Sequence, residues 1–127
     1  MPLFGAHMSI AKGYHNALLA AQRQGCDAVQ LFTKNNNRWA GKPLTQADTG
    51  LFQQTLRETG VRSLVAHDSY LINLASPDRA LYRRSIAAFV DELRRAEALG
   101  LDYLVFHPGA ATDDDAPSLS WAATALA

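Results

Sequence analysis

Short apolar runs alternate with longer amphipathic segments along the chain. The apolar runs have the length and composition of β-strands. They lie at residues 3–7, 28–32, 61–66 and 102–107. The longer segments carry apolar residues at the three-and-four spacing of a helix face. They lie at residues 9–24, 45–59 and 76–99, and a fourth ends at residue 127. The pattern predicts four strand–helix units.

Residues that cap or stop helices mark the ends of the first three amphipathic segments. Serine and threonine are favoured N-caps, proline suits the first helical position, and glycine often follows the last turn. Pro77 therefore fits the first turn of the third helix. The predicted N-caps are Ser9, Thr45 and Ser76, and the predicted stops are Gly25, Gly60 and Gly100.

The second and third helices are each predicted to bury one apolar face. In the second, Leu51 and Leu56 are expected to face the core, with Phe52 beside them. In the third, the predicted buried positions are Leu81, Ile86, Phe89, Val90, Leu93 and Ala96. Its other sides are predicted to carry the charges of Arg83, Arg84, Asp91, Glu92, Arg94, Arg95 and Glu97.

Four strand–helix units in succession predict an α/β fold with a parallel sheet and right-handed crossovers. The fourth strand is almost continuously apolar, which is typical of a strand covered on both faces. Such a (βα)4 unit could be a small open sheet or half of a TIM-type (β/α)8 barrel, which needs about 250 residues. Residues 1–127 are therefore expected to form a single partial domain. The chain ends inside an apparent helix with no closing cap, so we expect a truncated sequence.

Composition narrows the class of protein. Of 127 residues, 48% are hydrophobic and 19% are charged, and the formal net charge is +0. Bulk charge therefore draws the chain neither to nucleic acid nor to membrane, and any such binding needs a local patch. The lone Cys26, expected as a small buried residue, excludes an intramolecular disulfide. No apolar run approaches the ~18 residues of a membrane span, so a cytoplasmic location is expected.

Two histidines follow consecutive predicted strands. His67 and His107 each lie at a carboxyl-terminal strand end, and neighbouring strands are ~4.8 Å apart. Two imidazoles at one rim of a sheet can reach a single metal ion, with a carboxylate as a common further ligand. The alternative is that both histidines make ordinary hydrogen bonds. Asp68 could orient a histidine or cap its loop. His7 also ends a strand, which favours a polar site at this rim.

Basic residues gather in the loops after the first two predicted strands, on the same rim. They are Lys12, Lys34, Arg38 and Lys42. They could contact phosphates, or the loop could simply be solvated. Trp39 is most simply an anchor of this loop. Tyr70 lies three residues after His67 and could stack on a base or wedge into a duplex.

Several stretches, in this order and spacing, resemble the endonuclease IV family of zinc-dependent apurinic/apyrimidinic endonucleases. The match runs from about residue 3 to residue 109, and its most specific parts are the His67 stretch and the closing Phe-His-Pro-Gly. The stretches are Gly5-Ala6-His7-Met8-Ser9, Leu31-Phe32-Thr33-Lys34-Asn35 with Trp39, His67-Asp68-Ser69-Tyr70-Leu71-Ile72-Asn73-Leu74, Glu97-Ala98-Leu99-Gly100-Leu101 and Phe106-His107-Pro108-Gly109.

The resemblance implies an eight-stranded barrel with a trinuclear Zn²⁺ site at its carboxyl-terminal rim. The family cleaves double-stranded DNA on the 5′ side of an abasic site. His67 and His107 would be two ligands of one zinc, and the family's remaining ligands come from the later half of its barrel. No catalytic residue is expected in this chain beyond these ligands. Asp68 and His7 would support the ligands without binding the metal.

The resemblance also implies DNA contacts. Tyr70 matches a family position that inserts into the duplex at the lesion. A family arginine with a similar role corresponds to Asn37, with Arg38 one place on. Lys34 and Asn37 join Arg38 as expected DNA contacts. Half a barrel cannot assemble the trinuclear centre, so the 127 residues alone are expected to be inactive or nearly so. The open sheet edges could also associate with another chain.

Two other functions stay open at this point. A metal-dependent sugar isomerase or epimerase on a related barrel would also place metal ligands at strand ends, but it has no use for a basic loop beside Tyr70. A non-catalytic fragment that binds DNA or zinc is the second.

Overall fold

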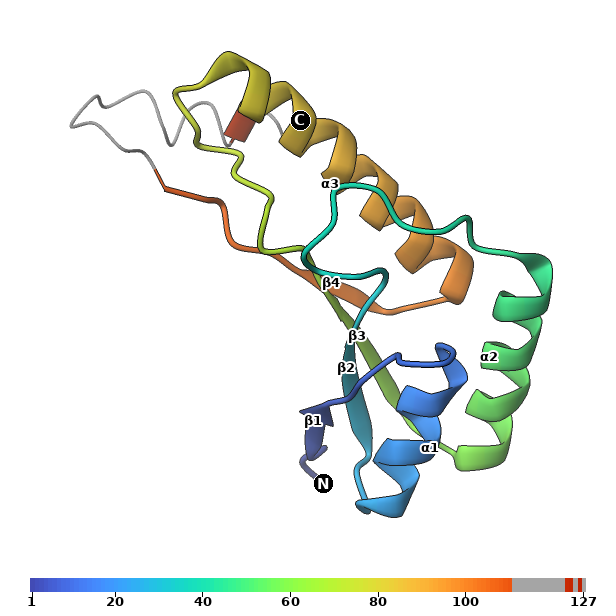
Figure 1. Cartoon of the computed structure of the whole chain (residues 1–127). Coiled ribbons are helices and arrows are strands. Elements are labelled where there is room, and N and C mark those ends of the chain that lie inside the picture. The colour runs from blue at the N-terminus through green and yellow to red at the C-terminus, as the bar shows by residue number, and fades with distance from the viewer. Residues whose placement is uncertain (111–122, 125, 127) are drawn as a thin grey trace.

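The computed structural model describes residues 1–110, 123, 124 and 126, and its core is a four-stranded parallel sheet in the order β1-β2-β3-β4 (Figure 1). This architecture confirms the predicted half of a TIM-type barrel. Most of the last predicted helix lies outside the described residues. The elements are β1 Gly5–His7, α1 His15–Arg23, β2 Ala28–Phe32, α2 Gln46–Thr59, β3 Ser63–His67, α3 Arg79–Leu99 and β4 Tyr103–Val105.

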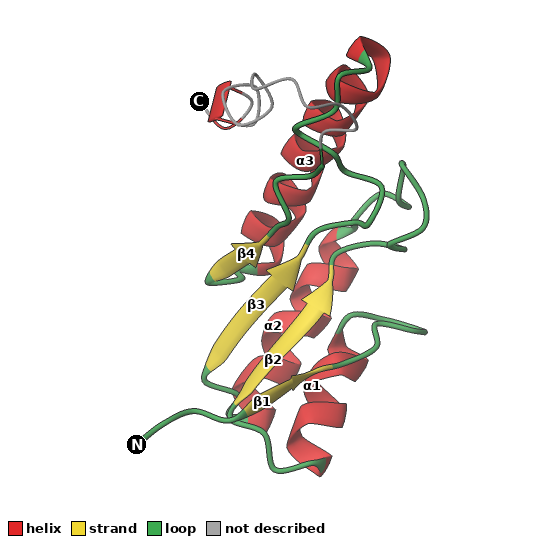
Figure 2. Cartoon of the chain, turned by 90° about the vertical axis from the view of Figure 1, so that its left-hand side faces the viewer, coloured by secondary structure: helices red, strands yellow, loops and turns green. Residues whose placement is uncertain are grey.

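The helices cover one face of the sheet and leave the other open (Figure 2). Buried residues alternate along β2 and β3, with Val29, Leu31, Leu64 and Ala66 on the covered face. On β4, by contrast, Tyr103 is 66% exposed and Val105 is 42% exposed. The expectation that the fourth strand is covered on both faces is therefore wrong, because α1, α2 and α3 all pack on the same side.

Two hydrophobic clusters stabilise this arrangement. The larger joins α1, α2 and the covered face of the sheet, and it includes Leu18, Leu31 and Phe52, each fully buried. The smaller packs the β3–α3 loop residues Ile72 and Leu74 against α3. Trp39 packs on this second cluster, and the Arg84 guanidinium lies 4.5 Å from its ring centroid. Trp39 is therefore an anchor of the β2–α2 loop, as predicted.

Two helices begin later than their sequence caps predict. α1 begins at His15, because Ser9 Oγ accepts only from the backbone N–H of Ala11 and the chain then turns through positive φ at Lys12 and Gly13. α3 begins after Asp78, whose carboxylate accepts from the first-turn N–H groups. Ser76 Oγ accepts from the N–H of Asp78 and thus shapes the approach to the helix.

The buried faces of α2 and α3 also differ from prediction. Leu51 is 44% exposed whereas Phe52 is fully buried. On α3, Val90 and Leu93 are exposed, while Phe89 and Ala96 are buried as expected. The buried face of α3 is completed by two charged residues predicted to face solvent, Glu92 at 1% and Arg95 at 7% exposure. No helix within the described part of the chain is long and apolar enough to cross a membrane.

The predicted N-cap of α2 is present as a reciprocal capping box. Thr45 Oγ1 accepts from the N–H of Asp48 at 3.1 Å, and the Asp48 carboxylate accepts from the N–H of Thr45 at 2.9 Å. We expect Thr45→Ala to lower the free energy of unfolding by about 1 kcal/mol, because it leaves the N–H of Asp48 unpaired. Urea titration followed by circular dichroism measures this. Thr45→Ser keeps the hydroxyl and should stay close to wild type, so equal losses in both variants would contradict a capping role.

Candidate functional site

Five aromatic and imidazole rings meet at the carboxyl ends of the strands, and we call them the rim cluster: His7, Phe32, His67, Tyr70 and His107. The sheet register pairs Phe32 with His67, and His67 with Val105. The His67 and His107 ring centroids are 5.1 Å apart, with an interplanar angle of 47°. β4 ends at Val105, two residues earlier than predicted, and the short segment after it brings His107 beside His67.

Phe32 lies at the centre of the rim cluster. Its centroid is 4.5 Å from that of His7, 5.7 Å from that of His67 and 5.6 Å from that of Tyr70. His7 Nδ1 also lies 3.0 Å from Gln30 Oε1. Phe32 therefore packs against both His7 and His67, and the predicted supporting role of His7 stays a prediction. Sequence reasoning did not single out Phe32, although it ends a predicted strand.

A hydrogen bond fixes how His67 can bind a metal. Its Nδ1 lies 2.9 Å from the backbone oxygen of Asp68. A carbonyl only accepts, so Nδ1 must carry the hydrogen, and in the neutral ring Nε2 keeps the lone pair. The Asp68 carboxylate lies 3.6 Å from Nδ1, beyond hydrogen-bonding distance. Asp68 orients His67 through its backbone.

The Asp68 side chain is buried at 2% exposure and faces the β4 end. It accepts a hydrogen bond from the backbone N–H of His107, while its own N–H donates to the backbone oxygen of Val105 at 3.0 Å. Burial, together with the nearby charge of Glu92, raises the pKa of this carboxyl to about 6. Asp68 therefore also links the ends of β3 and β4.

The donor set fits part of a zinc site. Two imidazoles from neighbouring strand ends match zinc's preference for histidine nitrogen, but a zinc site requires at least three protein ligands. Among the described residues, no three His, Cys, Asp or Glu side chains are grouped to hold a metal ion. His67 and His107 could therefore contribute two ligands, fewer than a zinc site requires.

The structure argues against direct phosphate contact by Lys34. Its side chain is 2% exposed, and its Nζ lies 3.2 Å from Glu92 Oε1 and donates to the backbone oxygen of Arg38 at 2.8 Å. The ammonium is thus satisfied inside the protein. Asn37 and Arg38 are exposed at the tip of the same loop, where they can meet a partner.

Tyr70 is the most exposed ring of the β3–α3 loop, at 66%. One edge of it rests on Phe32 and His67, with the His67 centroid 6.4 Å away. The ring therefore packs against Phe32 and His67, and the rest of its surface is open to solvent. That placement suits stacking on a nucleobase.

Asn73 ties the β3–α3 loop to the segment after β4. Its Oδ1 accepts from the N–H of Ala75 and Ala110, and its Nδ2 donates to the backbone oxygen of Ala110 at 2.9 Å. Gly109 has φ +109°, and a Cβ there would collide with Asn73 Oδ1. This clamp explains why glycine follows His107-Pro108, a feature that the sequence motif contained but did not explain.

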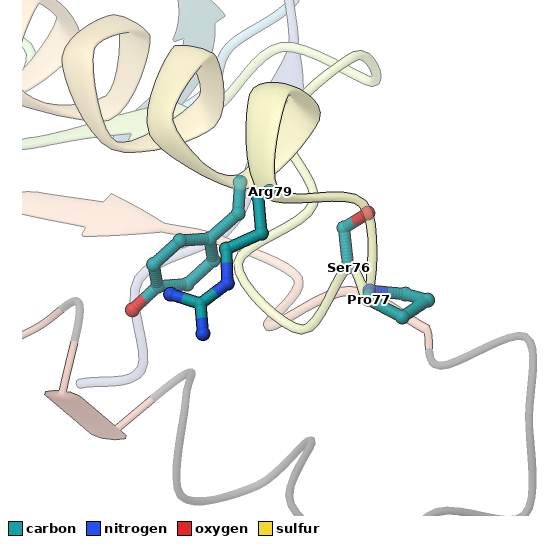
Figure 3. A pocket seen from close by; sticks show the side chains of 4 residues that line it. Ser76, Pro77 and Arg79 are labelled. Carbon is teal, nitrogen blue, oxygen red and sulfur yellow. The ribbon is translucent and has the colours of Figure 1, made fainter.

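A separate small pocket opens at the start of α3 (Figure 3). Its lining residues are Ser76, Pro77, Arg79 and Tyr82. It shares no residue with the rim cluster and contributes nothing to that site.

Comparison with known proteins places the chain in a family. The family described as xylose isomerase-like TIM barrel matches residues 18–127. The chain belongs to this family. Its membership agrees with the strand order and with the position of the rim cluster at the carboxyl ends of the strands.

Within the xylose isomerase-like TIM barrel family, the chain is similar to proteins named probable endonuclease 4. It is 46% identical to that of Citrifermentans bemidjiense over 114 residues, covering 90% of this chain and 40% of the relative. With that of Chlorobium luteolum it shares 50% identity over 111 residues, covering 86% and 40%. The chain thus spans about 40% of the length of these curated relatives.

Solved structures give the same result. Endonuclease IV from Thermus thermophilus superposes with a TM-score of 0.84 at 33% identity, covering 98% of this chain and 46% of that one. A D-psicose 3-epimerase superposes with a TM-score of 0.71 at 14% identity, again over 98% and 46%. The second likeness shows the fold alone, whereas the first extends to sequence.

Proposed function

We propose that this chain forms part of a zinc-dependent DNA repair endonuclease that hydrolyses the phosphodiester on the 5′ side of an abasic site. The observation that carries the proposal is the His67–His107 pair at adjacent strand ends. It occurs in a chain closely similar to proteins named probable endonuclease 4. A D-psicose 3-epimerase has the same fold at only 14% identity, so sugar chemistry has weaker support.

The residues of the rim have distinct tasks in this proposal. His67 and His107 hold zinc through ring nitrogens, and the Asp68 backbone keeps the His67 tautomer that leaves Nε2 free. A bound zinc ion lowers the pKa of its water and stabilises charge on phosphate oxygens. Further ligands are needed for hydrolysis, so the 127 residues alone are expected to cleave DNA hardly at all. A cleavage assay on an abasic duplex with added zinc tests this, and turnover of about 1 per second or more, ordinary for an enzyme, would contradict it.

DNA binding is assigned to exposed residues of the two loops beside the histidines. Tyr70 enters the duplex at the lesion, where the missing base leaves space for a ring. Arg38 and Asn37 contact the backbone nearby. Because the net charge of the chain is +0, binding depends on this local surface and should weaken with salt.

Tyr70→Ala is expected to weaken binding to an abasic duplex about tenfold, since a base–aromatic stack is worth about 1–3 kcal/mol. Fluorescence anisotropy with abasic and intact duplexes of one sequence measures the effect. Tyr70→Phe keeps the ring and should bind nearly as wild type. Tyr103 offers a matched control, because it is equally exposed at 66% but lies on β4. If Tyr103→Ala lost as much affinity as Tyr70→Ala, the assignment to Tyr70 would fail.

A further inference from the structure

A buried ion pair lies beneath the two loops that carry the proposed DNA contacts. Lys34 and Glu92 approach to 3.2 Å, and each side chain is only 2% exposed. Lys34 is the second residue after β2, whereas Glu92 comes from the middle of α3. A buried pair seldom adds stability beyond what apolar residues would give, since both ions lose their hydration. The position of the pair therefore calls for another explanation.

Each member of the pair holds one loop. Glu92 accepts from the backbone N–H of Ser69 with both carboxylate oxygens, at 3.0 and 3.2 Å. Ser69 immediately precedes Tyr70. Lys34 donates to the backbone oxygen of Arg38 at 2.8 Å, which closes the turn that carries Asn37 and Arg38. One ion pair thus fixes the bases of both loops.

A direct bond joins the loops above the pair. Ser69 Oγ donates to the backbone oxygen of Asn36 at 2.7 Å. One turn further along α3, Arg95 donates to the backbone oxygen of Lys42 at 2.8 Å and holds the far end of the β2–α2 loop. Glu92 and Arg95, the buried charged residues of α3, therefore bind the two ends of the β2–α2 loop, through Lys34 and the Lys42 carbonyl. These contacts account for the unexpected burial of both residues on the covered face.

We propose that Lys34 and Glu92 are a positioning pair that sets the β2–α2 and β3–α3 loops at a fixed distance, so that Arg38 and Tyr70 engage one DNA duplex together. Neither residue touches the DNA. The role of the pair in DNA binding rests on the proposed function, whereas its coupling of the two loops does not. The preference for an abasic site then depends on the Lys34–Glu92 ion pair, which is buried beneath the two DNA-binding loops.

The decisive variant is the double change Lys34→Met with Glu92→Gln. It removes both charges, while the introduced glutamine can still accept from the N–H of Ser69, so the fold is kept. The bond to the Arg38 carbonyl is lost. We expect amide hydrogen exchange at Asn37 and Arg38 to accelerate about tenfold by local opening, with Ser69 changing less. We also expect the preference for abasic over intact duplex to fall about fivefold or more, since a misplaced contact costs specificity.

Controls separate positioning from stability. Glu97→Gln removes the same charge from an exposed place on α3 and should alter neither exchange nor preference. Thermal unfolding of the double variant is measured alongside, because a purely structural pair would change stability and leave the abasic preference intact.

The exchange experiment needs no DNA, and unchanged amide exchange at Asn37 and Arg38 would overturn the coupling of the loops. Faster amide exchange with an unchanged preference for the abasic duplex would overturn the role of the ion pair in DNA recognition. If wild type itself shows no preference for the abasic duplex, the proposed function fails and the role in recognition fails with it, while the exchange result still decides the coupling.

Discussion

Replacing either His67 or His107 with alanine is expected to reduce the zinc affinity of this chain by more than ~100-fold. Even a partner that only orients a zinc-bound histidine is worth about 10–100-fold in affinity, and a ligand contributes more. The two rings lie 5.1 Å apart, close enough to bind one ion together, so removing either leaves that ion a single histidine of the pair. Competition with a chromophoric chelator measures the affinity of each variant.

His15 provides a matched control for this experiment. Like His67 it is half-buried, but it opens α1 and lies outside the rim cluster. His15→Ala should therefore bind zinc as wild type does. Retention of wild-type affinity by His67→Ala would show that zinc binds somewhere else, and the proposed zinc site would have to be abandoned.

Helix and strand identity could be predicted from the sequence because local residues determine it. Thr45 and Gly60 bound α2 as predicted, and Gly100 follows α3 in the left-handed conformation that ends a helix. The starts of α1 and α3 were misplaced, because a serine can cap a single turn as readily as a helix. After Ser9 the positive φ of Lys12 and Gly13 delays the start of the helix to His15, and Gly13 was the one signal of this turn in the sequence.

The histidine pair could also be predicted, because parallel register aligns His67 with Val105, the last residue of β4, and His107 follows only two residues later. The burial of Glu92 and Arg95 could not be predicted from the sequence. Lys34, the partner of Glu92, and the Lys42 carbonyl, which accepts from Arg95, are far away in the sequence, and the salt bridge of Arg95 to the neighbouring Asp91 does not by itself require burial. One signal was nevertheless present. The buried positions of α3 keep strict helical spacing only if the two charged residues are included: Ser85, Ala88, Phe89, Glu92, Arg95, Ala96 and Leu99.

The largest expected effect on stability comes from Glu92→Ala. It removes the carboxylate that pairs with Lys34, leaving an ammonium buried at 2% exposure without its counter-charge. It also leaves the N–H of Ser69 without its acceptor. Breaking a buried pair from one side costs about 3–5 kcal/mol, which is a large part of the roughly 5–15 kcal/mol that stabilises a typical domain. Urea unfolding should therefore show a strongly lowered midpoint or a chain that no longer folds.

We attribute this loss of stability to the unpaired Lys34 ammonium, and a second substitution tests that cause. Adding Lys34→Met to a Glu92→Gln background removes both charges and keeps an acceptor for Ser69, so most of the stability should return. Exposed Glu97 supplies the baseline, since its replacement by alanine should shift the free energy of unfolding by no more than about 0.5 kcal/mol. If the double variant were as unstable as Glu92→Ala, the orphaned charge would not be the cause, and the loss would instead come from the polar contacts that both variants lack. Recovery of stability together with loosened loops would instead assign the pair to the placement of Tyr70 and Arg38.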